Sequence, residues 1–150
     1  MATAMEVSER EEQLVAFHLA DELYGVDISI IHEIIRLREI TQIPRATADI
    51  EGVINLRGKI VPILDLRKRL GLPAVERNGQ TRIIVVEIAD CTVGMVVDGV
   101  TGVLRLPQAN IEPPSKLVSD LATDYIRGVG KTDAMLVILL NMHKVLRTEL

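Results

Sequence analysis

The chain has 150 residues, of which 48% are hydrophobic and 25% charged, and its formal net charge is −4. This length suits one domain of ordinary size or two very small ones, which fold without disulfides or a metal. The acidic balance and the presence of only three aromatic side chains argue against nucleic-acid partners, which need a basic surface and stacking rings. The single cysteine, Cys91, suits a reducing compartment.

No segment has the pattern of a membrane span or a secretion signal. The longest apolar run covers residues 134–140, far below the ~20 residues that cross a bilayer, and residues 1–12 are acidic and polar. We therefore expect a cytoplasmic protein without direct insertion into a membrane.

The first half of the chain is typical of short strands joined by turns. Residues 1–13 have no periodicity and predict a disordered leader. The expected elements that follow are strands at 14–19, 23–28, 40–44, 53–56 and 59–64, with helical turns at 46–51 and 66–70. Residues 29–36 fit either a helical turn or a strand. Pro62 predicts a sheet edge or a bulge for its strand, because proline has no N–H to donate.

After a polar linker at residues 73–81, the second half of the chain has the same order of strands and turns. Strands are expected at 82–89, 92–97, 99–106 and 134–140, with a loop at 107–114. Asp65 and Asn141 are suited to cap the helical turns that follow them, because their side chains accept from free backbone N–H groups.

These two halves form an internal repeat. Residues 19–25 lie over residues 88–94 at a constant offset of 69, which matches Gly25 to Gly94. From Gly52 and Gly128 onward the offset is 76, and it matches Asp65 to Asn141. The alternative is that any two strand–turn–strand units look alike, although alternation alone does not require glycines to match.

The repeat predicts an all-β protein with two small barrels packed side by side, because a sheet this small removes its edges only by closing. We expect the first barrel at residues 14–72 and the second at 82–150, and exchange of terminal segments between them is left open. The apolar excess should also pack one barrel against the other.

The partial matches to motifs for catalysis, metal binding and phosphate binding each lack a required residue. The run that begins at His32 starts a zinc-protease pattern, but Arg36 stands where the second histidine belongs. Residues 130–132 match the end of a phosphate-binding loop, but Tyr125 stands where its first glycine belongs. We expect no catalytic residues, no metal and no cofactor. The segment Asn55-Leu56-Arg57-Gly58 is left as either a solvated turn or an interface turn, since arginine is enriched at binding hot spots.

The chain resembles the family of CheW-type chemotaxis coupling proteins over residues 13–146. The most specific part is Gly-Val-Ile-Asn-Leu-Arg-Gly at 52–58, followed by Ile-Val-Pro-Ile-Leu-Asp-Leu at 60–66. Tyr-Gly-Val-Asp-Ile at 24–28, Glu33-Ile34 and Val-Gly-Met-Val-Val-Asp-Gly-Val at 93–100 support it.

The resemblance implies two five-stranded SH3-like barrels and a non-enzymatic scaffold. Such a scaffold couples methyl-accepting chemoreceptors to the histidine kinase CheA, and binds the kinase's double-barrel regulatory domain and the helical receptor tip. It implies recruitment from the cytoplasm to membrane-associated receptor arrays. The alternative is a small barrel module that binds an unknown ligand or regulatory partner.

The resemblance also assigns residues. It implies that Arg57 and Glu33 are functional, and we expect them to form a surface ion pair; Gly52 and Gly58 match turn positions that tolerate side chains poorly. The residues expected to bind the receptor are Ile31, Glu33, Ile34, Asn55, Arg57, Gly58, Val97 and Val100. Of these, Ile31, Ile34, Val97 and Val100 are expected to line a groove between the barrels. The residues expected to contact the kinase are Arg36, Thr41 and Gln42. For Ile34 and Val97, a role as core residues stays open.

Overall fold

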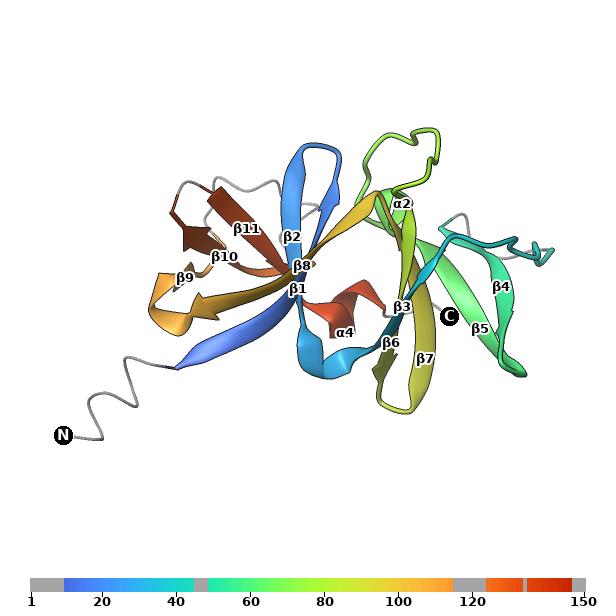
Figure 1. The fold of residues 1–150 in the computed structure, drawn as a ribbon, viewed down its shortest axis with the longest axis horizontal. Coiled ribbons are helices and arrows are strands. Elements are labelled where there is room, and N and C mark those ends of the chain that lie inside the picture. The colour runs from blue at the N-terminus through green and yellow to red at the C-terminus, as the bar shows by residue number, and fades with distance from the viewer. Residues whose placement is uncertain (1–9, 45–48, 115–123, 134, 147–150) are drawn as a thin grey trace.

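The computed structural model describes residues 10–44, 49–114, 124–133 and 135–146, and these form two closed β-sheets that lie side by side (Figure 1). Barrel 1 contains strands β1 (Glu11–Leu19), β2 (Glu22–Asp27), β8 (Gly99–Pro107), β9 (Ile111–Glu112), β10 (Ile126–Thr132) and β11 (Met135–Leu140). Barrel 2 contains β3 (Ile31–Arg36), β4 (Ile50–Leu56), β5 (Lys59–Asp65), β6 (Arg82–Ile88) and β7 (Cys91–Val97). The helices are α2 (Leu66–Arg69), α4 (Met142–Val145) and the single 3-10 turns η1 (Ile28–Ile30) and η2 (Gln108–Asn110). The all-β prediction is confirmed, with β9 as a sixth strand in barrel 1.

The two halves of the chain exchange strands. β3 follows β2 in sequence but pairs with β6 in barrel 2, and β8 follows β7 but pairs with β1 in barrel 1. Each half therefore gives its first hairpin to one barrel and its remaining strands to the other. The barrels do not coincide with residues 14–72 and 82–150, because periodicity along one strand does not specify which strand it will pair with.

Several local expectations also change. Residues 11–13, expected in the disordered leader, belong to β1, whereas residues 1–9 lie outside the described part. Of the strand expected at 40–44, only a bridge at Thr41 forms, and the helical turn expected at 46–51 is β4 from Ile50 onward, with residues 45–48 outside the description. Pro62 lies in β5, an inner strand between β7 and β4. It is tolerated because the ladder to β7 begins only at Ile63.

Both barrels close by the same device. In barrel 2, Thr41 and Val53 exchange two backbone hydrogen bonds of 2.9 Å, which join the segment after β3 to β4. A Cβ atom on Gly52 would lie 2.1 Å from the carbonyl oxygen of Thr41, so only glycine fits there. In barrel 1, the equivalent Gly128 lies beneath the carbonyl of Glu112, and a Cβ atom would approach that oxygen to 2.9 Å. Gly52 thus serves close backbone approach within a strand, not the turn that was expected.

The internal repeat is reproduced in strand register. In barrel 1, Gly25 of β2 pairs in parallel with Leu139 of β11, and in barrel 2 Gly94 of β7 pairs in parallel with Ile63 of β5. These pairs correspond at the offsets of 69 and 76. Both predicted helix caps are present, since the side chains of Asp65 and Asn141 accept from the backbone N–H groups of Lys68 and Lys144.

The largest apolar cluster lies between the barrels. It contains 14 buried residues from both barrels, against seven inside barrel 2 and four inside barrel 1. Helix α4, which follows barrel 1, lies between the two barrels (Figure 1). The expectation that the apolar excess packs barrel against barrel is confirmed, and burial of this area is the main force that holds the barrels together.

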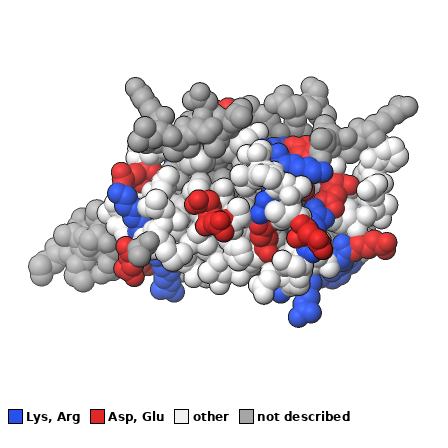
Figure 2. All heavy atoms as spheres, turned by 90° about the horizontal axis from the view of Figure 1, so that it is seen from above, with Lys and Arg blue, Asp and Glu red and all other residues white. Residues whose placement is uncertain are grey.

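On the face seen in Figure 2, acidic and basic side chains stand next to one another at both ends of the molecule. This distribution follows the sequence, in which 17 basic and 21 acidic residues nearly balance. Because charges of both signs stand together there, this face does not concentrate a field of one sign.

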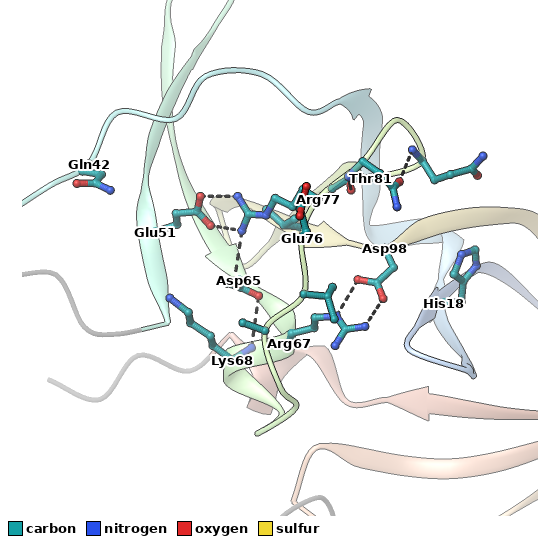
Figure 3. A pocket seen from close by; sticks show the side chains of 15 residues that line it. His18, Gln42, Glu51, Asp65, Arg67, Lys68, Glu76, Arg77, Thr81 and Asp98 are labelled. Carbon is teal, nitrogen blue, oxygen red and sulfur yellow. Dashed lines mark hydrogen bonds and ion pairs between the residues drawn. The ribbon is translucent and has the colours of Figure 1, made fainter.

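A buried ion pair connects the barrels beside this cluster. Arg67 of α2, whose side chain is 9% exposed, donates from Nε to Oδ1 of Asp98 at 2.9 Å (Figure 3). It also donates from Nη1 to the carbonyl of Pro73 at 2.6 Å. Asp98 also accepts from the backbone N–H of Ala20 in the β1–β2 turn at 2.8 Å. Hydrogen bonding to Arg67, reinforced by the Ala20 N–H, holds the pKa of Asp98 below its usual range despite partial burial. The pair joins α2, the β7–β8 junction and barrel 1.

The closure device predicts that Gly52→Ala destabilises the fold, because the added methyl group must push Thr41 away from β4. We expect a loss of about 2–3 kcal/mol in the free energy of unfolding, measured by urea denaturation. Gly79→Ala is the matched control, since a Cβ atom there meets no atom within 4 Å. Equal stability of Gly52→Ala and Gly79→Ala would contradict the closure device.

The inter-barrel ion pair predicts that Asp98→Asn lowers stability at pH 7 by about 2–4 kcal/mol, because Arg67 then keeps a buried charge without its counter-ion. A carboxylate with a lowered folded-state pKa contributes stability above its ordinary value of 3.8 and loses it as the pH falls toward the folded value. The gap between parent and variant should therefore narrow between pH 5 and pH 3 in urea titrations. Asp21→Asn, at an exposed turn, is the control, and a gap independent of pH would refute the assignment.

Candidate functional site

The candidate site is built on the β4–β5 hairpin. Alternation along β4 buries Ile54 and Leu56 and turns Asn55 outward. The chain then reverses through Arg57 and Gly58, both left-handed, with φ values of 52° and 88°. Asn55 stabilises this turn, because its Oδ1 accepts from the N–H of Gly58 at 2.7 Å. Glycine at the second position suits such a two-residue turn, and the hydrogen bond offsets part of the cost of a left-handed arginine.

The turn presents Arg57 to Glu33. Nη2 of Arg57 donates to Oε2 of Glu33, which lies on β3, so the expected ion pair is present. The Arg57 side chain is 69% exposed and that of Glu33 is 23% exposed. Exposed pairs of this kind contribute only ~0–1 kcal/mol to stability. The pair therefore orients Arg57 and leaves most of its guanidinium facing solvent.

The apolar residues assigned to the groove divide into three kinds. Ile34 is 39% exposed. Ile31 and Val100 are half-buried against the cluster between the barrels, at repeat-equivalent positions. Val97 is fully buried in that cluster, so it lines no groove and the core alternative holds for it. The burial of Val97 follows from its strand, because β7 is covered by the barrel 2 interior on one face and by barrel 1 on the other.

The three residues expected to contact the kinase lie along β3 and the segment after it. Arg36 ends β3 opposite Arg82, Thr41 makes the closing bridge, and Gln42 follows on the surface. All three are exposed, and Gln42 also lines the polar pocket described below.

Four exposed apolar side chains on the strands were not expected from the sequence. In barrel 2, Ile60 is 62% exposed, and its repeat equivalent in barrel 1, Leu136, is 58% exposed. Val103, the equivalent of Ile34, is 62% exposed, and Met135 beside Leu136 is 50% exposed. Applied to outward-facing positions, the repeat offsets would have found Ile60, Leu136 and Val103, because apolar residues recur there in both halves. Met135 corresponds to Lys59, so the repeat gives no signal for it. Each barrel thus exposes apolar side chains at equivalent places.

A polar pocket of 680 Å³ lies between α2, the β7–β8 junction and residues 74–81 (Figure 3). Arg77 reaches across it and pairs with Glu51, and Nη2 of Arg77 lies 3.4 Å from Oδ2 of Asp65. The hydrogen bond to Glu51 raises the pKa of Arg77. The carboxylates of Glu51, Asp65 and Asp98 all pair with arginines. The pairs made by Arg77 hold the 73–81 segment against barrel 2.

The described residues hold neither a metal-binding cluster nor a membrane-spanning helix. Within these ranges, no group of three or more His, Cys, Asp or Glu side chains is placed to hold a metal ion. None of the helices described above is long and apolar enough to cross a membrane.

Comparison with known proteins identifies the family. The sequence model of the CheW-like domain matches residues 13–150. The chain is similar to chemotaxis protein CheW of Klebsiella aerogenes, with 38% identity over 92% of this chain and 83% of that protein. It is also similar to chemotaxis protein CheW of Treponema pallidum, with 32% identity over 97% of this chain and 88% of that protein.

Comparison of the fold with solved structures identifies the same family. The crystal structure of scaffolding protein TtCheW from Thermoanaerobacter tengcongensis matches with a TM-score of 0.85 and 40% sequence identity, and the match covers 93% of this chain and 94% of that one. The two interleaved barrels, the Glu33–Arg57 pair on its glycine turn and these matches lead to one conclusion: the chain belongs to the CheW family.

Proposed function

We propose that this protein is a non-enzymatic chemotaxis scaffold that couples methyl-accepting chemoreceptors to the histidine kinase CheA. Membership of the CheW family and the likeness to a protein described as scaffolding support this role. The observation that carries it is an exposed Arg57, oriented by Glu33 on a fixed turn. A pre-oriented guanidinium with free donors is suited to recognise a carboxylate of a partner protein.

The receptor surface combines this arginine with apolar side chains. Ile34 lies next to Glu33 on β3, and Ile31 and Val100 offer half-buried apolar surface against the cluster between the barrels. A receptor tip made of helices would lay an apolar stripe over such a surface and place an acidic residue near Arg57. Val97 supports this surface from beneath.

The kinase surface follows from the repeat. The regulatory domain of the kinase is itself a double barrel, so barrel-to-barrel packing at equivalent edges is the natural geometry. The exposed Ile60 and Leu136 at equivalent positions suit this packing. Arg36, Thr41 and Gln42 remain the proposed polar contacts. Binding of both partners would recruit the protein from the cytoplasm to membrane-associated receptor arrays.

The direct test is co-purification of the full chain with a CheA regulatory domain and, separately, with a receptor tip fragment. We expect both to be retained, and the ternary mixture to form a larger complex on size-exclusion chromatography. Retention of neither partner would refute the scaffold role and favour a barrel module with another partner.

The ion pair predicts a charge-swap result. Glu33→Arg and Arg57→Glu each create a like-charge contact, and each should weaken receptor-tip binding roughly tenfold, whereas the double swap should recover part of the affinity. Isothermal titration calorimetry measures the three dissociation constants. The exposed pair Glu12–Arg127 of barrel 1 provides matched swaps that should leave binding unchanged. A double swap that restores nothing would show that the pair is not the functional unit.

The apolar part of the surface predicts that Ile34→Asp weakens receptor-tip binding by tenfold or more, because a carboxylate replaces exposed apolar contact area on β3. Ile34 is 39% exposed, so the fold should tolerate the change. Val75→Asp is the control, since Val75 is 52% exposed on the linker. Equal affinities of the two variants would remove Ile34 from the receptor surface.

A further inference from the structure

An apolar pocket of 470 Å³ lies between helix α4 and the β6–β7 turn. Its walls are mainly aliphatic, with Leu64 from β5, Ile88 and Val93 from the β6–β7 hairpin, and Leu146 after α4. The volume falls within the range of about 300–1,000 Å³ that is usual for small-molecule sites. Neither the family assignment nor the scaffold role makes use of this pocket.

The internal repeat shows what fills the equivalent space elsewhere in the molecule. Val93 corresponds to Tyr24, and its cross-strand partner Val86 corresponds to Phe17. In barrel 1 the Phe17 and Tyr24 rings stack, with centroids 5.9 Å apart and planes inclined by 14°. Tyr24 is only 7% exposed, so its ring is part of the core. Two valines stand at the equivalent place in barrel 2, where ring volume is therefore missing.

The helix that borders each space also carries a different side chain at the equivalent position. In barrel 1, the space next to Tyr24 is bordered by Arg67 of α2, which is buried and is held in place by Asp98. Its equivalent on α4 is His143, which is exposed and lines the pocket. Arg67 thus closes the barrel 1 space, whereas His143 leaves the barrel 2 space open to solvent. The pocket therefore corresponds to the volume that the Tyr24 ring and the Arg67 guanidinium occupy at the equivalent place in barrel 1.

The charge around the pocket limits its ligand. Among the described residues, the ionisable lining side chains apart from Cys91 are Arg69 and His143, and none is acidic. Arg69 is paired with Asp49, so the pocket is close to neutral, with a basic rim. Neutral or anionic ligands suit such a rim better than cations.

We propose that this pocket binds a small molecule with one aromatic ring, neutral or anionic, whose ring takes the position that Tyr24 has in barrel 1. Such a ligand would contact α4, which follows barrel 1, and the β6–β7 hairpin of barrel 2 at once. It would therefore stiffen the arrangement of the two barrels, and this inference is independent of the scaffold role.

The test is a titration of the full chain with p-cresol, the free counterpart of a tyrosine side chain, followed by methyl NMR. We expect a dissociation constant of roughly 1 mM for so small a ligand, with shifts confined to the methyl groups that line the pocket, those of Ile50, Leu64, Ile88, Val93 and Leu146 included. 4-Hydroxybenzoate should bind at least as tightly, and benzylamine at least threefold more weakly. Cys91 is the single cysteine of the chain, it lines the pocket, and its alkylation rate should fall several-fold at saturating p-cresol.

Filling the pocket provides the decisive variant. Val93→Tyr restores the ring of the repeat, and it should raise the melting temperature and weaken p-cresol binding at least tenfold. Ile88→Phe, at the other wall, serves if Val93→Tyr does not fold. Val103→Tyr is the matched control on the exposed surface of barrel 1 and should leave binding unchanged. Shifts spread over the surface, or undiminished binding to a folded filled variant, would overturn the proposal.

Discussion

The exchange of β3 and β8 between the barrels is the constraint on which the other features of this structure depend. Because β3 completes barrel 2 and β8 completes barrel 1, neither half of the chain can close a barrel by itself. The exchange also holds the hairpins β1–β2 and β6–β7 against each other, which creates the largest apolar cluster at the junction. Stability is therefore shared, and the two barrels should unfold as one cooperative unit.

The same skeleton has diverged in its surface chemistry. Arg57 of barrel 2 corresponds to Asp133 of barrel 1, and both lie at left-handed turn positions, with φ values of 52° and 23°. Glu33 corresponds to Gly102, which has no side chain to form a pair. The ion pair is therefore confined to one barrel, whereas the exposed apolar positions Ile60 and Leu136 are kept in both. The repeated fold thus carries the Glu33–Arg57 pair in barrel 2 alone and an exposed apolar position in both barrels.

Much of the local structure could be predicted from the sequence, because caps, turns and alternation are short-range properties. Asp65 and Asn141 were identified as caps for this reason, and most of the strands lie where alternation placed them. The strand exchange could not be predicted, since β3 has the same apolar pattern whichever barrel it joins. The burial of Val97 was equally hidden, because a strand covered on both faces and a groove wall both have apolar runs. The roles proposed for Glu33 and Arg57 rest on the family resemblance and not on their spacing in the sequence.

The parallel pairing in each barrel has a consequence for how such a fold can arise. Gly25 pairs with Leu139, and Gly94 pairs with Ile63, so each parallel contact joins the first half of the chain to the second. This is the arrangement that two identical half-length chains would adopt by exchanging strands about a two-fold axis. Residues 73–81 then act as the tether that turns such a homodimer into a single chain. Fusion allows the two halves to differ in sequence. The aromatic pair of barrel 1, the valines of barrel 2 and the Glu33–Arg57 pair are differences that a symmetric dimer could not have.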